Sequence, residues 1–117
     1  MSHSVCSRFH RAVELIGGRW SGAILQAVLA GHHRYCDLKD AIPGLSDTML
    51  TQRLRSLEAE GLLDRCVLPT SPVRVEYYPT PKGSALGPVL QAIETWAQQW
   101  IEPVDLPARD VPAHATQ

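Results

Sequence analysis

The stretch Tyr35–Glu60, which reads YCDLKDAIPGLSDTMLTQRLRSLEAE, decides the fold of this chain. Two segments with helical periodicity, residues 36–42 and Ser46–Glu60, flank the turn signal Pro43-Gly44. Because so short a turn keeps two helices close together, the pattern predicts a helix-turn-helix over residues 35–60.

Side-chain type separates the two faces of these helices. In the short helix, Leu38 and Ala41 are expected to point inward. The longer helix has a clear start, because Ser46 is a good N-cap residue and Asp47 is favourable in the first turn. Its inward face is expected to consist of three leucines, Leu50, Leu54 and Leu57.

The opposite face of the longer helix is polar or cationic. A helix that reads DNA enters the major groove, where glutamine pairs with adenine, arginine with guanine, and threonine contacts a phosphate or a thymine methyl. Taken alone, an amphipathic helix with a solvated polar face would look the same. The neighbouring short helix and turn favour DNA binding. The predicted DNA-binding residues of this segment are Ser46, Asp47, Thr48, Thr51, Gln52, Arg53 and Arg55.

Further elements are expected on both sides of the helix-turn-helix. In chain order they are helices at residues 7–16 and 19–30, strands at residues 63–68 and 73–78, and a last helix at residues 81–100. The two strands form an antiparallel hairpin. The expected fold class is therefore mainly α with a small β-hairpin, arranged as a winged helix-turn-helix. We expect one domain at residues 6–101 and a proline-containing flexible tail at residues 102–117.

Arg74 lies next to a hairpin loop that contains no acidic residue. An arginine on the wing can reach a phosphate or a narrow minor groove, so Arg74 joins the predicted DNA-binding residues. The alternative is a solvent-exposed strand charge paired with Glu76. The sequence alone leaves both open.

Composition sets weaker limits. The chain has 117 residues, 44% of them hydrophobic, which fits a single globular domain with its own core. The net charge of −1 gives no support to nucleic-acid binding, so a basic surface must be local. No apolar stretch is long enough to span a membrane, and residues 1–5 lack a secretory signal. We therefore expect a cytoplasmic protein with no membrane partner.

Five short motifs follow one another along the chain. They are LIGGRW at residues 15–20, RYCDL at 34–38, PGLS at 43–46 with LTQRL at 50–54, PVRVEY at 72–77, and TPKG at 80–83. Together they resemble the HxlR family of bacterial winged-helix regulators, over roughly residues 6–100. The resemblance implies a MarR/HxlR-like fold and a homodimer that binds a two-fold operator in double-stranded DNA, usually as a repressor.

In this family the dimer contacts come from the first and last helices, here residues 7–16 and 81–100. These two segments are therefore the expected dimerisation helices, and the wide apolar stripe of the last one suits a partner surface. The implied interface residues are Phe9, Val13, Leu86, Val89, Leu90, Ile93, Trp96, Ala97 and Trp100.

Cys6 precedes the first predicted helix, where the helix dipole favours a thiolate. Its position fourteen residues before Trp20 is similar to that in the YodB-like quinone and electrophile sensors of the HxlR family. Two positions depart from their pattern: Ser7 replaces a proline, and Ile101 stands where those sensors keep a second cysteine. The resemblance therefore implies direct alkylation or a mixed disulfide with a small thiol. The alternative is an inert thiol.

Cys36 and Cys66 are expected to be structural, with Cys36 partly exposed and Cys66 buried in an apolar strand. The histidines near the cysteines do not match zinc-site spacings, so no metal or cofactor is predicted. No catalytic motif occurs, so an enzyme is not expected.

The competing function is a winged-helix module for protein contacts without DNA affinity. A small electrophile or an apolar effector is a further candidate partner, the latter in a pocket between the last helix and the DNA-binding part.

Overall fold

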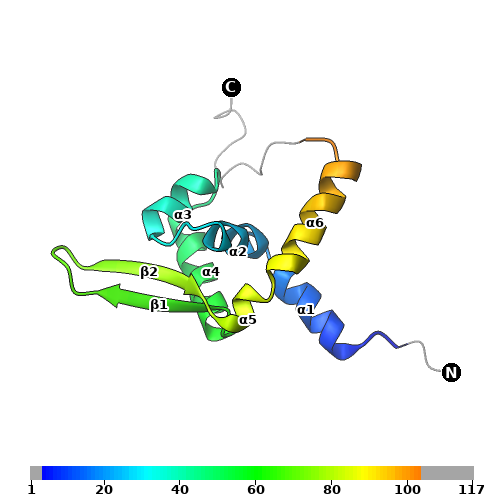
Figure 1. Cartoon of the computed structure of the whole chain (residues 1–117), viewed down its shortest axis with the longest axis horizontal. Helices are drawn as coiled ribbons and strands as arrows, with labels where there is room; N and C mark the ends of the chain where they lie inside the picture. Colours follow the sequence, from blue (N-terminus) through cyan, green and yellow to red (C-terminus); the bar gives the residue numbers. More distant parts are fainter. Residues whose placement is uncertain (1–3, 104–117) are drawn as a thin grey trace.

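The computed structural model describes residues 4–103. Its elements are α1 (Ser7–Gly17), α2 (Ser21–Leu29), α3 (Tyr35–Ala41), α4 (Asp47–Ala59), β1 (Leu63–Leu68), β2 (Arg74–Pro79), α5 (Pro81–Ser84) and α6 (Gly87–Trp100). In Figure 1, α2, α3 and α4 lie at the centre, the hairpin extends to one side, and α1 and α6 extend to the other. This order confirms the predicted mainly α fold with a small β-hairpin. Of the predicted tail, residues 104–117 lie outside the described residues.

The core forms where α4 packs against α2. The three leucines predicted to face inward on α4 are buried, each at most 2% exposed. They share one cluster with Ile24, Leu25 and Val28 of α2 and with Leu62 and Leu63 at the start of the hairpin. Because this cluster uses one whole side of α4, the polar side of the helix must face outward.

Local signals place the ends of α4 close to their predicted positions. Ser46 is the N-cap, and its hydroxyl accepts a hydrogen bond from the backbone N–H of Met49 at 3.2 Å. After α4, Gly61 has a φ of 77°, a left-handed conformation that glycine adopts without steric cost. Leu38 of α3 is buried as predicted, but Ala41 is exposed. Ile42 takes the inward position instead, because α3 ends at Ala41 and the chain turns there.

The single helix predicted at residues 81–100 is wrong, because two helices occupy this stretch. The short α5 ends at Ser84, and α6 starts at Gly87. Pro88 explains the break. Proline has no N–H to donate, and within a continuous helix its ring would clash with the carbonyl of Ser84 four residues earlier. At the start of α6 that N–H is not needed, so Pro88 is tolerated there.

The hairpin corrects the expectation for Cys66. Tyr77 is buried, with 9% of its surface exposed, and so is Leu63, so these two residues define the inner face of the hairpin. Cys66 pairs with Glu76 in the antiparallel register and belongs to the opposite face, because neighbouring residues in a strand alternate sides. Cys66 is therefore exposed rather than buried.

The second strand starts at Arg74, one residue later than predicted, which leaves Val73 exposed in the loop.

Gly83 gives a test of the packing between α5 and the start of β1. A Cβ atom at this position would clash with the backbone carbonyl of Leu62, whereas a Cβ at Gly87 would meet no atom within 4 Å. We expect Gly83→Ala to lower the free energy of unfolding by about 1–3 kcal/mol, because the backbone must shift. Gly87→Ala is the matched control and should leave the stability unchanged or slightly higher. Urea unfolding measures both, and equal stability of the two variants would contradict this packing.

Candidate nucleic-acid interface

Of the seven DNA-binding residues predicted for α4 and its N-cap, six divide into two groups. Some of them have a structural role within the protein. Arg53 donates from Nε to the carbonyl oxygen of Arg19 at 2.7 Å, which ties α4 to the segment before α2. The carboxylate of Asp47 accepts a hydrogen bond from the Tyr35 hydroxyl at 3.2 Å and lies 3.4 Å from the Lys39 ammonium. With Ser46 as the N-cap, these residues hold α4 in its orientation.

The other group is free to contact a ligand. Thr48, Gln52 and Arg55 are exposed, and no hydrogen bond or ion pair engages their side chains within the described part of the chain. They lie on the side of α4 opposite the buried leucines. A rigid helix therefore presents three unengaged polar side chains to solvent.

Tyr35 is a site residue that the sequence analysis missed. Its hydroxyl donates to the backbone carbonyl of Asp47 at 3.1 Å and lies 3.3 Å from the hydroxyl of Thr51. Tyr35 begins α3, so it links the two helices of the helix-turn-helix directly. Nothing in the local pattern indicates this role, because the contact spans residues far apart in the sequence.

The hairpin is anchored to the helix-turn-helix at its base. The backbone N–H of Tyr77 donates to the carbonyl of His33 at 2.8 Å, and the His33 ring stacks on the Tyr78 ring at 4.1 Å between centroids. The Tyr78 hydroxyl donates to the Glu76 carboxylate at 2.5 Å, and this hydrogen bond raises the pKa of Tyr78. The base of the wing is therefore held in a defined position relative to α3.

Arg74, the first residue of β2, lies near an acidic partner. Its guanidinium is 3.7 Å from the Glu76 carboxylate, while 44% of its side-chain surface remains exposed. Arg74 therefore forms the ion pair with Glu76 that the sequence analysis gave as the alternative to a DNA contact. A contact of Arg74 with DNA stays a prediction, and such a contact would compete with Glu76 for the guanidinium.

The apolar face, defined here as the exposed hydrophobic side chains of α1 and α6, lies on two helices that project away from the hairpin in Figure 1. Six of the residues predicted for the dimer interface are large hydrophobic side chains that remain exposed here: Phe9, Val13, Val89, Ile93, Trp96 and Trp100. The other three differ. Leu90 is 9% exposed and belongs to the core, while Leu86 and Ala97 are half-buried.

Cys6 is the N-cap residue of α1 and is exposed, with no side-chain hydrogen bond to the helix. The ring of His10, one turn later in α1, lies 3.5 Å from the carboxylate of Glu14. Cys36 and Cys66 are also exposed free thiols. Exposure by itself therefore does not distinguish Cys6 from the other two cysteines, and Cys36 also lies in the first turn of a helix, α3. The Cys36 thiol differs in that it donates to the Asp37 carboxylate at 3.8 Å.

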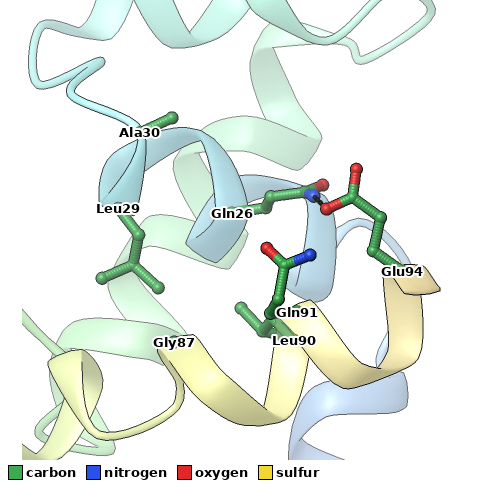
Figure 2. A pocket seen from close by; sticks show the side chains of 7 residues that line it. All are labelled: Gln26, Leu29, Ala30, Gly87, Leu90, Gln91 and Glu94. Carbon is green, nitrogen blue, oxygen red and sulfur yellow. Dashed lines mark hydrogen bonds between the residues drawn. The ribbon is translucent and has the colours of Figure 1, made fainter.

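A groove between α2 and α6 lies where the sequence left room for an effector. Figure 2 shows one part of it, in which Gln26 donates to Glu94 at 3.2 Å above Leu29 and Leu90. This part has a volume of about 260 Å³, and a second part, toward Ile16 and Ile93, of about 440 Å³. The two parts share the Gln26–Glu94 hydrogen bond and Leu90. The groove therefore combines an apolar floor with one polar bridge.

Two classes of site find no support among the described residues. No group of three His, Cys, Asp or Glu side chains lies close enough together to hold a metal ion. None of the helices is both long and apolar enough to cross a membrane.

The fold and the exposed side of α4 define a helix-turn-helix transcription regulator with a wing, and comparison with known proteins agrees. A profile described as HxlR-like helix-turn-helix matches residues 15–105. The HTH-type transcriptional regulator YvaP of Bacillus subtilis is 43% identical over 99 residues, which cover 85% of this chain and 92% of YvaP. The HTH-type transcriptional regulator YodB of the same organism is 39% identical over 105 residues, covering 90% of this chain and 94% of YodB.

The solved structures of YodB are similar as well. Its reduced form has a TM-score of 0.74 at 39% identity, covering 87% of this chain and 100% of that one. Its quinone-bound form has a TM-score of 0.70 at 35% identity, covering 82% of this chain and 100% of that one. The chain belongs to the HxlR-like helix-turn-helix family, as the sequence motifs indicated. Its relatives are transcription regulators and not enzymes.

Proposed function

We propose that this protein is a transcriptional repressor that acts in the cytoplasm and binds a two-fold DNA operator as a homodimer. The observation that carries the proposal is the outward side of α4. Thr48, Gln52 and Arg55 are exposed and unengaged there, whereas Ser46, Asp47 and Arg53 brace the helix from its flanks. A helix held rigidly with free polar side chains suits base contacts in a major groove.

Symmetry extends this proposal. A two-fold dimer would place its two reading helices roughly 34–36 Å apart, one turn of DNA. The exposed apolar face of α1 and α6 supports such a dimer, because side chains such as Trp96 and Trp100 are 58% and 67% exposed. Exposed patches of large hydrophobic side chains mark interaction surfaces.

DNA binding is tested with Gln52→Ala and an operator selected from random DNA. If Gln52 contacts a base, the variant should lose about 1–3 kcal/mol of binding free energy on the operator and almost none on random DNA. Gln99→Ala, an exposed glutamine on α6, is the matched control. Fluorescence anisotropy over a series of salt concentrations measures both variants.

Two outcomes would count against the DNA proposal. Equal losses on operator and random DNA would remove Gln52 from the base-reading residues. A wild-type protein with no DNA affinity at any salt concentration would favour the alternative, a module for protein contacts, since DNA binding weakens steeply with rising salt.

The dimer is tested by placing a charge on the apolar face. Ile93→Glu and Trp100→Glu should each shift the protein from dimer to monomer, because a buried unpaired carboxylate is costly. Val73→Glu is the control, since Val73 is 62% exposed in the loop of the hairpin. In Figure 1 the hairpin extends to the side away from α6. Sedimentation velocity reports the oligomeric state. A dimer that persists in both α6 variants would move the interface to another surface.

We also propose that Cys6 is where a quinone or similar electrophile acts. Its exposed thiol lies at the N-terminus of α1, where the helix dipole favours the thiolate. In the addition, the thiolate sulfur bonds to a ring carbon of the quinone, and that carbon then loses its hydrogen as a proton. This proton and the one released by the thiol end on the two quinone oxygens, so the ring becomes a hydroquinone. No second cysteine or external oxidant is needed. Because α1 forms part of the apolar face, a bulky adduct there would disturb the dimer.

Cys6→Ser tests this role. The variant should stay bound to DNA in the presence of a quinone, because the serine hydroxyl is too weak a nucleophile to add to the quinone ring at neutral pH. Cys36→Ser and Cys66→Ser are matched controls, since both thiols are also exposed, and both variants should be released like the wild type. Intact-mass spectrometry counts the adducts alongside the DNA-binding assay. Release of Cys6→Ser at wild-type quinone concentrations would show that Cys6 is not the sensor.

A further inference from the structure

A polar cleft of about 360 Å³ lies between α4 and the hairpin. Three elements line it: the start of α3, one edge of α4, and the inner face of the wing. The lining residues are Tyr35, Thr51, Arg55, Glu58, Arg65 and Tyr77. Of these six residues, only Thr51 and Arg55 were among the DNA-binding residues predicted from the sequence. The cleft joins them to Arg65, a wing residue to which the sequence analysis assigned no role.

Strand register explains why Arg65 faces this cleft. Arg65 pairs with Tyr77 across the hairpin, and residues paired in this way point to the same face of the sheet. Because Tyr77 is buried against the core, Arg65 lies on the inner face, toward α4. Cys66, the next residue, lies on the outer face. The wing therefore directs a guanidinium toward the reading helix.

The charges of the cleft are unbalanced. Arg55 and Arg65 are exposed, and neither forms an ion pair or hydrogen bond within the described residues. Glu58 supplies the one carboxylate in the lining and is likewise unpaired there. Two guanidinium groups thus face one carboxylate, although the whole chain has a net charge of −1. The local excess of positive charge is the feature that overall composition hides.

We propose that this cleft binds a phosphate of the DNA backbone, with Arg55 contacting it from α4 and Arg65 from the wing. The inference rests on the proposed DNA binding. One sugar-phosphate backbone separates each major groove from the neighbouring minor groove. A protein with its helix in the first groove and its wing at the second must therefore have that backbone between them, at this cleft. Guanidinium groups suit the site because they donate two parallel hydrogen bonds to phosphate oxygens.

The phosphate clamp, formed by Arg55 and Arg65, changes the expected role of Arg55. A phosphate contact positions the protein on DNA but carries no direct sequence information. Base reading then falls to Thr48 and Gln52, which do not line the cleft. The hydroxyl of Thr51 lies 3.3 Å from that of Tyr35, and this contact joins α3 to α4 in the lining of the cleft.

The decisive experiment measures the salt dependence of DNA binding for Arg65→Ala. Losing one phosphate contact should reduce the slope of log K against log salt concentration by about 0.9 per protomer, or about 1.8 for a symmetric dimer. Affinity for the operator and for random DNA should fall by the same factor. Arg65→Lys keeps the charge and should keep most of the slope. Arg8→Ala, on α1 and likewise exposed and unpaired, should match the wild type.

Glu58→Gln provides a test in the opposite direction. Removing the carboxylate that faces the bound phosphate should raise affinity for operator and random DNA alike, a gain that a purely structural role would not produce. Unfolding curves for each variant check that the fold is kept. An unchanged slope in Arg65→Ala, or weaker binding by Glu58→Gln, would overturn the clamp while Gln52→Ala still reports base reading. A wild-type protein without salt-dependent DNA affinity would overturn both the clamp and the proposed function.

Discussion

The structure depends on the packing of one leucine face of α4 against α2. Leu50, Leu54 and Leu57 are at most 2% exposed, and this burial fixes the rotation of α4 about its own axis. That rotation determines which side chains of α4 face outward. Had α4 turned by one residue, which is 100°, Arg53 would face outward and Gln52 would face the flank. The hydrophobic cluster therefore decides which side chains can meet a partner.

Polar contacts then hold the parts around α4 in place. Tyr35 joins α3 to α4, Arg53 joins α4 to the segment before α2, and the backbone of Tyr77 joins the hairpin to His33. These contacts bridge elements that are separate in the sequence. Together they make the helix-turn-helix and the base of the wing one unit, which explains why a cleft between them has a defined lining.

A second set of contacts connects α4 to α1 and α5. At the C-terminal end of α4, the Glu60 carboxylate pairs with Arg11 of α1, and its backbone carbonyl accepts from Lys82 of α5 at 2.8 Å. The helix that Cys6 caps is thus attached directly to the C-terminal end of α4.

The order of elements, the N-cap at Ser46 and the inward leucines follow from the sequence alone, because caps and periodicity are local properties of the chain. The family follows from its motifs in the same way. Tertiary structure alone decided the burial of Leu90 in the core, the exposure of Cys66, the contacts of Tyr35 with α4 and the place of Arg65 on the inner face of the hairpin. The break before α6 has a local cause in Pro88, yet the helical periodicity across it masks that signal. Register and long-range packing place these side chains, and no window of neighbouring residues contains the partners that decide them.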